Sequence, residues 1–248
     1  MSTFRTRTPG TANPRTGRSL RRPLAAFGVA LALLAGAVGL APSADAAPSS
    51  EPRGRLTART PADLPIYAQR GDAAPVLTLP ATTEFGTTRV VLVTKRAGAW
   101  LQVALPERPN GSTGWVRASD VELRRVADRL DIDLASRTLT WMRGRDVVLT
   151  TSIATGAVET PTPTGRFYVT DLLDTPDGGG YGPFAIGVSA HSDTLSEFGG
   201  GDGQIGVHGT SDPSSIGQAV SHGCVRVPND VITRLATSLP LGTPVRVR

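Results

Sequence analysis

The chain has 248 residues, long enough for one or two domains, and a formal net charge of +5. Six of its 26 basic residues and one of its 21 acidic residues lie in residues 1–46, so from residue 47 onward the two kinds are equal at 20 each. The positive charge therefore belongs to the N-terminal segment, and no retained basic patch points to a nucleic-acid partner. A single cysteine excludes an internal disulfide.

Residues 1–46 predict a secretory signal peptide. An arginine-rich start without acidic residues (1–22) precedes an apolar run (24–41) and a small-x-small site that ends at Ala46. Cleavage is expected after Ala46, and the mature chain is expected to be exported and soluble. A retained anchor is the alternative, because the apolar run is just long enough to span a thin bilayer. The pattern leaves the export route open.

Residues 47–54 predict a short disordered linker, because they are polar and have no hydrophobic period. Short runs of β-formers separated by turn residues follow, at 77–79, 89–94, 100–105 and 115–117. Such spacing predicts a small barrel, and residues 114–123 resemble the end of a bacterial SH3-like domain. We therefore place an SH3-like domain at 55–125. Trp100 and Trp115 are predicted to be core residues rather than the lining of a peptide groove.

A second domain is predicted at 128–248, with the seam at 126–128. Leu130, Ile132 and Leu134 alternate with polar residues, which is typical of a half-buried strand. Further strands are expected at 139–142, 147–155, 166–170, 183–188, 204–207 and 243–247. A helix is expected from Asn229, its N-cap, to the residue before Pro240. The loop 174–182 is expected to be flexible. The fold class is mainly β, with one or two short helices.

Cys224 and His208 are the candidate reactive pair. They lie sixteen positions apart, at either end of a run of Gly, Ser, Thr, Asp and Pro that predicts a loop. A thiol with a pKa of about 8.5 is only a few per cent ionised at neutral pH, so a nucleophilic cysteine needs a partner that accepts its proton. Two imidazoles are available, those of His208 and His222. A buried structural cysteine is the alternative, but a loop rich in Ser and Gly is not core sequence.

The stretch Ser221-His222-Gly223-Cys224-Val225-Arg226, with His208-Gly209 upstream, resembles the signature of the L,D-transpeptidases, whose catalytic domain is known as YkuD. Residues 154–156 and 160–165 look like a second recurring stretch of that family. The resemblance covers roughly the last 120 residues and implies a β-sandwich or barrel. It implies that Cys224 is the nucleophile, that His208 is the base, and that a Gly209 carbonyl orients the imidazole, a role for which no particular side chain is expected. It implies no metal and no cofactor.

Four more residues of the motif are predicted to serve substrate binding. Gly223 is expected to let backbone N–H groups approach an oxyanion. His222 either donates to substrate or fixes the loop, and we favour the second. Arg226 either binds a substrate carboxylate or braces the loop, and Ser221 either caps the turn or contacts peptide. His191 is expected to be structural, or to line the acceptor side of the cleft.

By resemblance, the predicted function is peptidoglycan L,D-transpeptidation in the cell wall, a reaction that maintains wall organisation and cell shape. The partners would be a donor tetrapeptide stem and an acceptor amine, a 3-3 cross-link would form with release of D-alanine, and carbapenems would acylate the cysteine. Hydrolysis of the acyl-enzyme would make the protein an L,D-carboxypeptidase instead. Two further alternatives are a non-catalytic wall-binding protein and a zinc hydrolase that uses His208, His222 and Cys224.

Overall fold

The computed structural model describes residues 54–175, 179–198 and 200–248. The predicted signal peptide, the linker up to residue 53 and residues 176–178 of the predicted flexible loop lie outside the described residues. Within the described ranges, no helix has both the length and the hydropathy needed to cross a bilayer.

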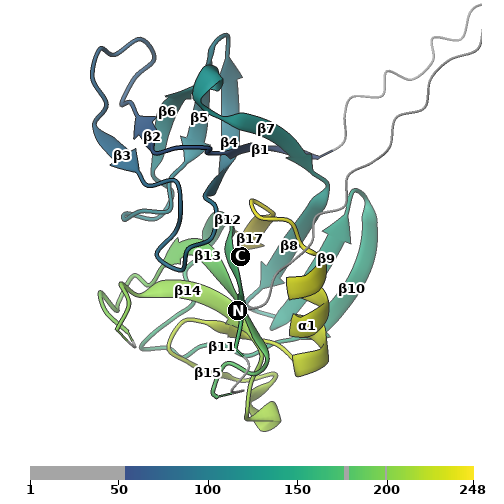
Figure 1. Cartoon of the computed structure of the whole chain (residues 1–248). Coiled ribbons are helices and arrows are strands. Elements are labelled where there is room, and N and C mark those ends of the chain that lie inside the picture. Colours follow the sequence, from purple (N-terminus) through teal and green to yellow (C-terminus); the bar gives the residue numbers. More distant parts are fainter. Residues whose placement is uncertain (1–53, 176–178, 199) are drawn as a thin grey trace, which may run out of the picture. The chain divides into compact units, whose positions relative to one another are not determined.

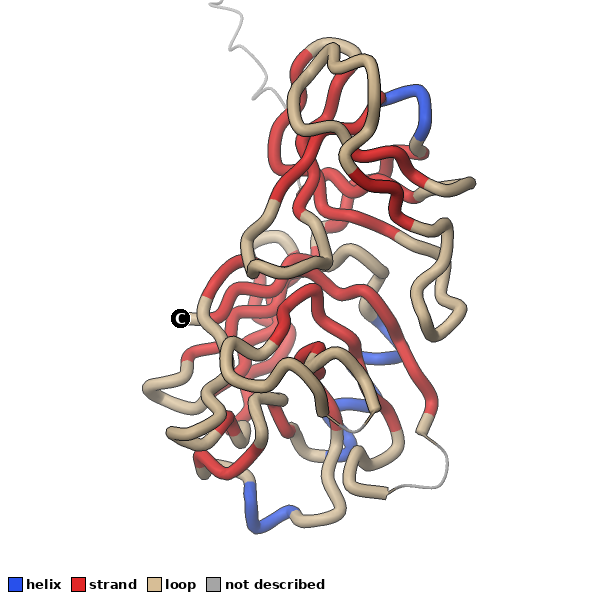
Figure 2. Tube along the Cα trace, turned by 90° about the vertical axis from the view of Figure 1, so that its left-hand side faces the viewer, coloured by secondary structure: helices blue, strands red, loops and turns tan. Residues whose placement is uncertain are grey.

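Strands make up 49% of the structure and helices 8%, so the predicted mainly β fold class is confirmed (Figure 2). The α-helix α1 spans Asn229–Ser238, and two 3-10 helices, η1 and η2, span Ala118–Asp120 and Pro213–Ser215. The strands, all but β16 labelled in Figure 1, are β1 Arg55–Arg59, β2 Leu64–Ile66, β3 Leu77–Leu79, β4 Val90–Ala97, β5 Trp100–Ala104, β6 Thr113–Arg117, β7 Glu122–Val126, β8 Asp128–Asp133, β9 Thr138–Arg143, β10 Asp146–Ser152, β11 Thr155–Gly156, β12 Gly165–Asp174, β13 Phe184–His191, β14 Gln204–His208, β15 Ala219–Ser221, β16 Val225–Arg226 and β17 Pro244–Val247.

The N-terminal part of the described chain is a small β module. An antiparallel sheet of five strands has the order β6-β5-β4-β1-β7, and β2 pairs with β3 beside it. Alternate residues of these strands point inward, so that Val91, Leu101 and Val116 are fully buried in its core. This sheet ends at Val126 and the next begins at Asp128. Its membership of the SH3-like class stays a prediction.

The two tryptophans of this module were predicted to be core residues, and that prediction is wrong. Trp100 and Trp115 are only half-buried and lie outside the buried cluster. Trp100 packs edge-on against Tyr67, with ring centroids 5.2 Å apart, and the Arg117 guanidinium lies 5.7 Å from its centre. Arg70 covers Trp115 at 5.2 Å. Arginine stems and cation–π contacts shield these rings, so the sheet does not have to bury them.

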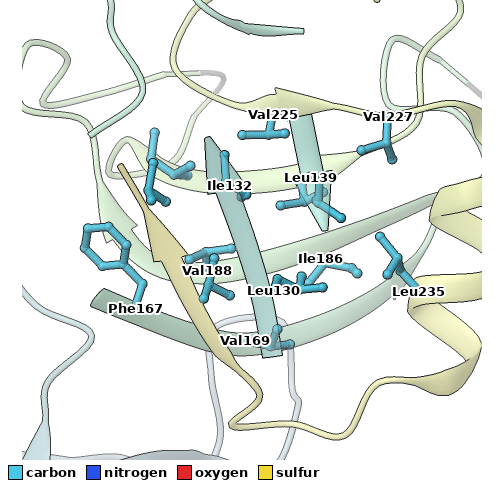
Figure 3. Close-up of a cluster of buried hydrophobic side chains, with 14 of the residues drawn as sticks. Leu130, Ile132, Leu139, Phe167, Val169, Ile186, Val188, Val225, Val227 and Leu235 are labelled. Atoms are coloured by element: carbon cyan, nitrogen blue, oxygen red, sulfur yellow. The ribbon is translucent and has the colours of Figure 1, made fainter. Parts of the chain in front are cut away.

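The C-terminal part contains an eight-stranded sheet of order β10-β9-β8-β17-β12-β13-β14-β16. Its neighbours are antiparallel except β8 with β17 and β14 with β16, which are parallel. Figure 3 shows the buried side chains of these strands meeting in one core, with Leu130 and Ile132 from β8 and Leu235 from α1 among them. The helix lies against β13 and β14 because its stripe of Ile232 and Leu235 is fully buried there.

The predicted N-cap role of Asn229 is also wrong. Pro228 occupies the N-cap position of α1, and no side chain caps the helix. The Asn229 side-chain oxygen instead accepts a hydrogen bond of 2.8 Å from the N–H of Thr210. A residue typical of helix starts thus fixes the loop that follows His208.

Candidate active site

Cys224 and His208 line one cavity of about 440 Å³. His208 is the last residue of β14, and Cys224 stands immediately before β16. These two strands are parallel neighbours in which Val207 lies opposite Val225. The pairing therefore brings the end of one strand next to the start of the other, although sixteen residues separate the two side chains along the chain.

The imidazole of His208 is held by its own neighbour. Nδ1 lies 2.6 Å from the carbonyl oxygen of Gly209, and since a carbonyl only accepts, Nδ1 carries the proton. Tyr181 packs edge-on against the ring, with centroids 4.6 Å apart. Burial lowers the pKa of His208 to about 4, and the charge of Arg226 acts in the same direction, while the bond to Gly209 opposes it. The imidazole is thus neutral at neutral pH, with a free lone pair on Nε2.

The sulfur of Cys224 is largely buried beside β14. The N–H of Gly206 donates to Sγ over 3.4 Å. Burial raises the pKa of Cys224, and the Gly206 contact and the charge of Arg226 only partly offset that increase. The resting pair is therefore a thiol and a neutral imidazole, rather than the preformed thiolate that a simple reading of a Cys-His pair suggests.

Gly209 has a steric reason to be glycine, which the sequence reasoning did not foresee. A Cβ there would lie 2.3 Å from the side-chain oxygen of Asn229 and 3.1 Å from the carbonyl oxygen of Tyr181. A side chain would therefore push away both the amide that holds Thr210 and the loop that carries Tyr181.

We expect Gly209→Ala to lower stability by about 1–3 kcal/mol, the usual cost of overpacking, and to lower activity with it. Gly179→Ala is the control, because no atom lies within 4 Å of a Cβ built there. Urea denaturation and the rate of cysteine acylation measure both effects. Equal stability of the two variants would contradict the steric role of Gly209.

The loop before Cys224 is braced by hydroxyl groups. Ser221 Oγ accepts from the N–H of Gly223 at 3.1 Å and donates to the carbonyl oxygen of Cys224 at 2.5 Å. Thr162 Oγ1 donates to the carbonyl of Gly223 at 2.8 Å, and Thr160 Oγ1 donates to that of Ser221 at 3.0 Å. Ser221 is 2 % exposed and spans the turn, so its contacts favour capping over substrate binding. The threonines come from the 160–165 stretch quoted above.

Gly223 has a φ of +115°, a region that strongly favours glycine. A Cβ there would lie 2.9 Å from Ile205 Cδ1. The N–H of Gly223 already donates to Ser221, whereas the N–H of Cys224 takes no part in these contacts. Of the N–H groups of Gly223 and Cys224, that of Cys224 is therefore the one left available to an oxyanion.

His222 and Arg226 line a smaller pocket of about 190 Å³, which also reaches Cys224 and His208. The His222 ring is exposed and stacks on Phe198, with centroids 4.8 Å apart and planes at 28°. This contact favours loop support over catalysis for His222. Arg226 Nε is buried and has no hydrogen-bond partner. Among the described residues no carboxylate pairs with Arg226, and its side chain lines the pocket, which fits the substrate-carboxylate role better than an internal brace.

Sequence reasoning missed Tyr181 and Phe198, which line both pockets. Both lie in glycine-rich loops without periodicity, where a lone aromatic residue is the available signal. His191, predicted to be structural, bonds through Nε2 to Asp202 Oδ2 at 2.9 Å and does not line the catalytic cavity.

The zinc alternative required His208, His222 and Cys224 to converge. In the part of the chain that the structure describes, no group of three or more His, Cys, Asp or Glu side chains is arranged to hold a metal ion. Nδ1 of His208 is moreover occupied by the Gly209 carbonyl.

Comparison with known proteins finds similarity over the region that contains the cavity. Residues 127–247 match the family model of YkuD, described as the L,D-transpeptidase catalytic domain. The putative L,D-transpeptidase YkuD of Bacillus subtilis (strain 168) is 35% identical over 116 residues, which are 47% of this chain and 63% of that protein. The putative L,D-transpeptidase YqjB of the same organism is 36% identical over 108 residues, 39% of this chain and 57% of that protein. The chain thus spans less than two thirds of these relatives.

Solved structures also resemble the chain. An L,D-transpeptidase from Mycobacterium tuberculosis H37Rv matches with a TM-score of 0.42 and 16% identity, over 75% of this chain and 76% of that one.

Proposed function

We propose that this protein, whose residues 127–247 form a YkuD-type L,D-transpeptidase catalytic domain, is a peptidoglycan L,D-transpeptidase that acts through a thioester on Cys224. The observation that carries the proposal is the shared cavity of Cys224 and His208, in which the Gly209 carbonyl fixes the imidazole with Nε2 free to accept a proton. A wall substrate implies action outside the cytoplasm, in keeping with the predicted signal peptide.

Acylation begins with a neutral pair, so proton transfer accompanies attack. Nε2 of His208 takes the proton of Sγ while sulfur bonds to the carbonyl carbon of the third residue of the donor stem. The N–H of Cys224 stabilises the oxyanion of the tetrahedral intermediate. The imidazolium then gives its proton to the leaving amine, D-alanine departs, and a thioester remains.

Deacylation reverses the roles. An acceptor amine bonds to the thioester carbon, Nε2 of His208 removes one of its protons, and sulfur leaves and recovers that proton as the thiol. The product is a 3-3 cross-link. The same thioester chemistry makes Cys224 the site at which a carbapenem would acylate the protein.

The low pKa of His208 predicts the acid limit of acylation. Only the neutral imidazole accepts the thiol proton, so the rate should stay nearly constant from pH 7 down to about pH 5 and be halved near pH 4, where the pKa of His208 lies. Intact-mass time courses of carbapenem acylation at each pH measure it. A midpoint near 6.5, the ordinary value for histidine, would contradict the effect of burial on this ring.

An L,D-carboxypeptidase is the second candidate, because Cys224 is partly exposed and water as well as an amine can reach its thioester. Mass spectrometry of muropeptides after incubation with donor stems separates the two: dimers mean transfer, and trimmed monomers alone mean hydrolysis. We expect dimers once the acceptor amine is present in millimolar excess.

A further inference from the structure

A second hollow of about 160 Å³ adjoins the catalytic cavity and is formed by both β modules. The loop between β3 and β4 supplies Glu84 and Phe85, and the loop after β5 supplies Glu107. The opposite wall includes Asp171 of β12 and Asp202, just before β14. Glu84, Phe85, Asp202 and Gln204 line both this hollow and the cavity that holds Cys224, so the two spaces adjoin.

The walls of this hollow are acidic. Four carboxylates, those of Glu84, Glu107, Asp171 and Asp202, face one guanidinium, that of Arg89. Arg89 is engaged with its own loop, since Nε donates to the carbonyl of Pro80 at 2.6 Å and a second nitrogen donates to that of Thr82 at 3.0 Å. The hollow therefore favours a cation.

Two buried residues contribute to this wall. His191 is 4 % exposed, and its Nε2 lies 2.9 Å from a carboxylate oxygen of Asp202. Asp171 is 1 % exposed, and its Oδ1 accepts a hydrogen bond of 2.6 Å from Thr83 Oγ1, while its Oδ2 has no hydrogen-bond partner among the described residues. Because a carboxylate oxygen in so buried a residue is costly without a donor, the wall lacks a donor.

The hollow is rigid before any ligand arrives. The Asn110 side chain bonds both the N–H and the carbonyl of His191, at 2.9 and 2.7 Å. Arg108 donates to the carbonyls of Ser192, Leu195 and Asp202, and Thr83 Oγ1 donates to Asp171 Oδ1 at 2.6 Å. The N-terminal module thus holds the loop that forms one wall of the catalytic cavity.

We propose that this hollow binds the primary ammonium on the third residue of the donor stem, whose reacting carbonyl occupies the catalytic cavity. This inference rests on the proposed function. An ammonium group offers three donors, no acceptor and a positive charge, which matches four carboxylates, including the buried Asp171 with its unpartnered Oδ2. Half-exposed Phe85 lines both spaces, where the aliphatic part of the side chain would pass.

The test uses a double variant, Glu84→Gln with Glu107→Gln, which removes two exposed carboxylates without touching the loop clamp. The control is Glu122→Gln, which loses only an exposed ion pair with Arg59 in the same module. Donor tetrapeptides carry either lysine or Nε-acetyl-lysine at the third position. Thioester formation without acceptor is followed by intact mass, and transfer is followed by dimer yield against acceptor concentration.

If the ammonium belongs to the donor, the double variant raises the donor KM about tenfold for the lysine peptide, the effect of losing one charge-assisted hydrogen bond, and leaves the acetylated peptide unchanged. A rise in the acceptor KM alone would overturn the assignment of the hollow to the donor. Unchanged KM values in both arms overturn the inference while leaving the proposed function intact. Failure of the unaltered protein to acylate with either donor overturns the proposed function itself.

Discussion

Under the proposed mechanism, Cys224→Ala is expected to reduce cross-link formation by at least about 10⁴-fold, because the acyl-enzyme would form on the sulfur of Cys224. Muropeptide mass spectrometry measures the loss. The variant should remain folded, since Cys224 is a small side chain at the edge of the core and the turn around it is held by Ser221 and Thr162.

Binding of the Cys224→Ala variant to purified peptidoglycan is the companion measurement. We expect it to be retained, since the acidic hollow is untouched and Arg226 keeps its side chain in the neighbouring pocket. If both wall binding and cross-linking matched those of the unaltered protein, the protein would be a non-catalytic wall-binding protein instead.

His208→Ala is expected to lower the acylation rate by about 10²–10⁴-fold, the usual contribution of a general base. The residual rate should rise with pH, because only the spontaneously ionised thiol then reacts and burial raises the pKa of Cys224. Stopped-flow acylation by a carbapenem between pH 6 and 10 measures both the rate and its pH dependence.

His222→Ala is the matched control for His208→Ala, because its exposed ring stacks on Phe198 in the neighbouring pocket. A loss below about tenfold is expected for a loop-supporting residue. A larger loss with His222→Ala than with His208→Ala would mean that His222, and not His208, is the general base.

Much of the fold follows from short-range patterns. Leu130 and Ile132 alternate with polar residues and are buried in β8 as predicted, and the apolar stripe with Ile232 and Leu235 forms α1 up to the residues before Pro240. The failures concern residues whose partners are distant in sequence. Asn229 bonds Thr210 rather than the helix, and Trp100 is shielded by Arg117.

In the candidate site, too, the short motif predicted some features, and others depend on contacts between distant residues. Cys224, His208 and Gly209 stand in a compact motif, so the residue types and their spacing were enough to propose them. Neither their protonation states nor the steric demand at Gly209 follows from the motif, because burial and the approach of Asn229 depend on the packed structure.

The sequence also did not predict that residues of the N-terminal module line the catalytic cavity. Glu84 and Phe85 belong to an ordinary polar turn. The hydrogen bond of Thr83 to Asp171 in β12 brings that turn to the cavity, and Arg108 holds the loop between β13 and β14 beside it.

The most direct measurement is the mass of the protein during turnover of a donor tetrapeptide without acceptor, followed by peptide mapping. The proposed mechanism predicts a covalent adduct of the donor less D-alanine, carried by the peptide that contains Cys224 and absent from Cys224→Ala. Release of D-alanine by a protein whose Cys224 stays unmodified throughout would contradict it.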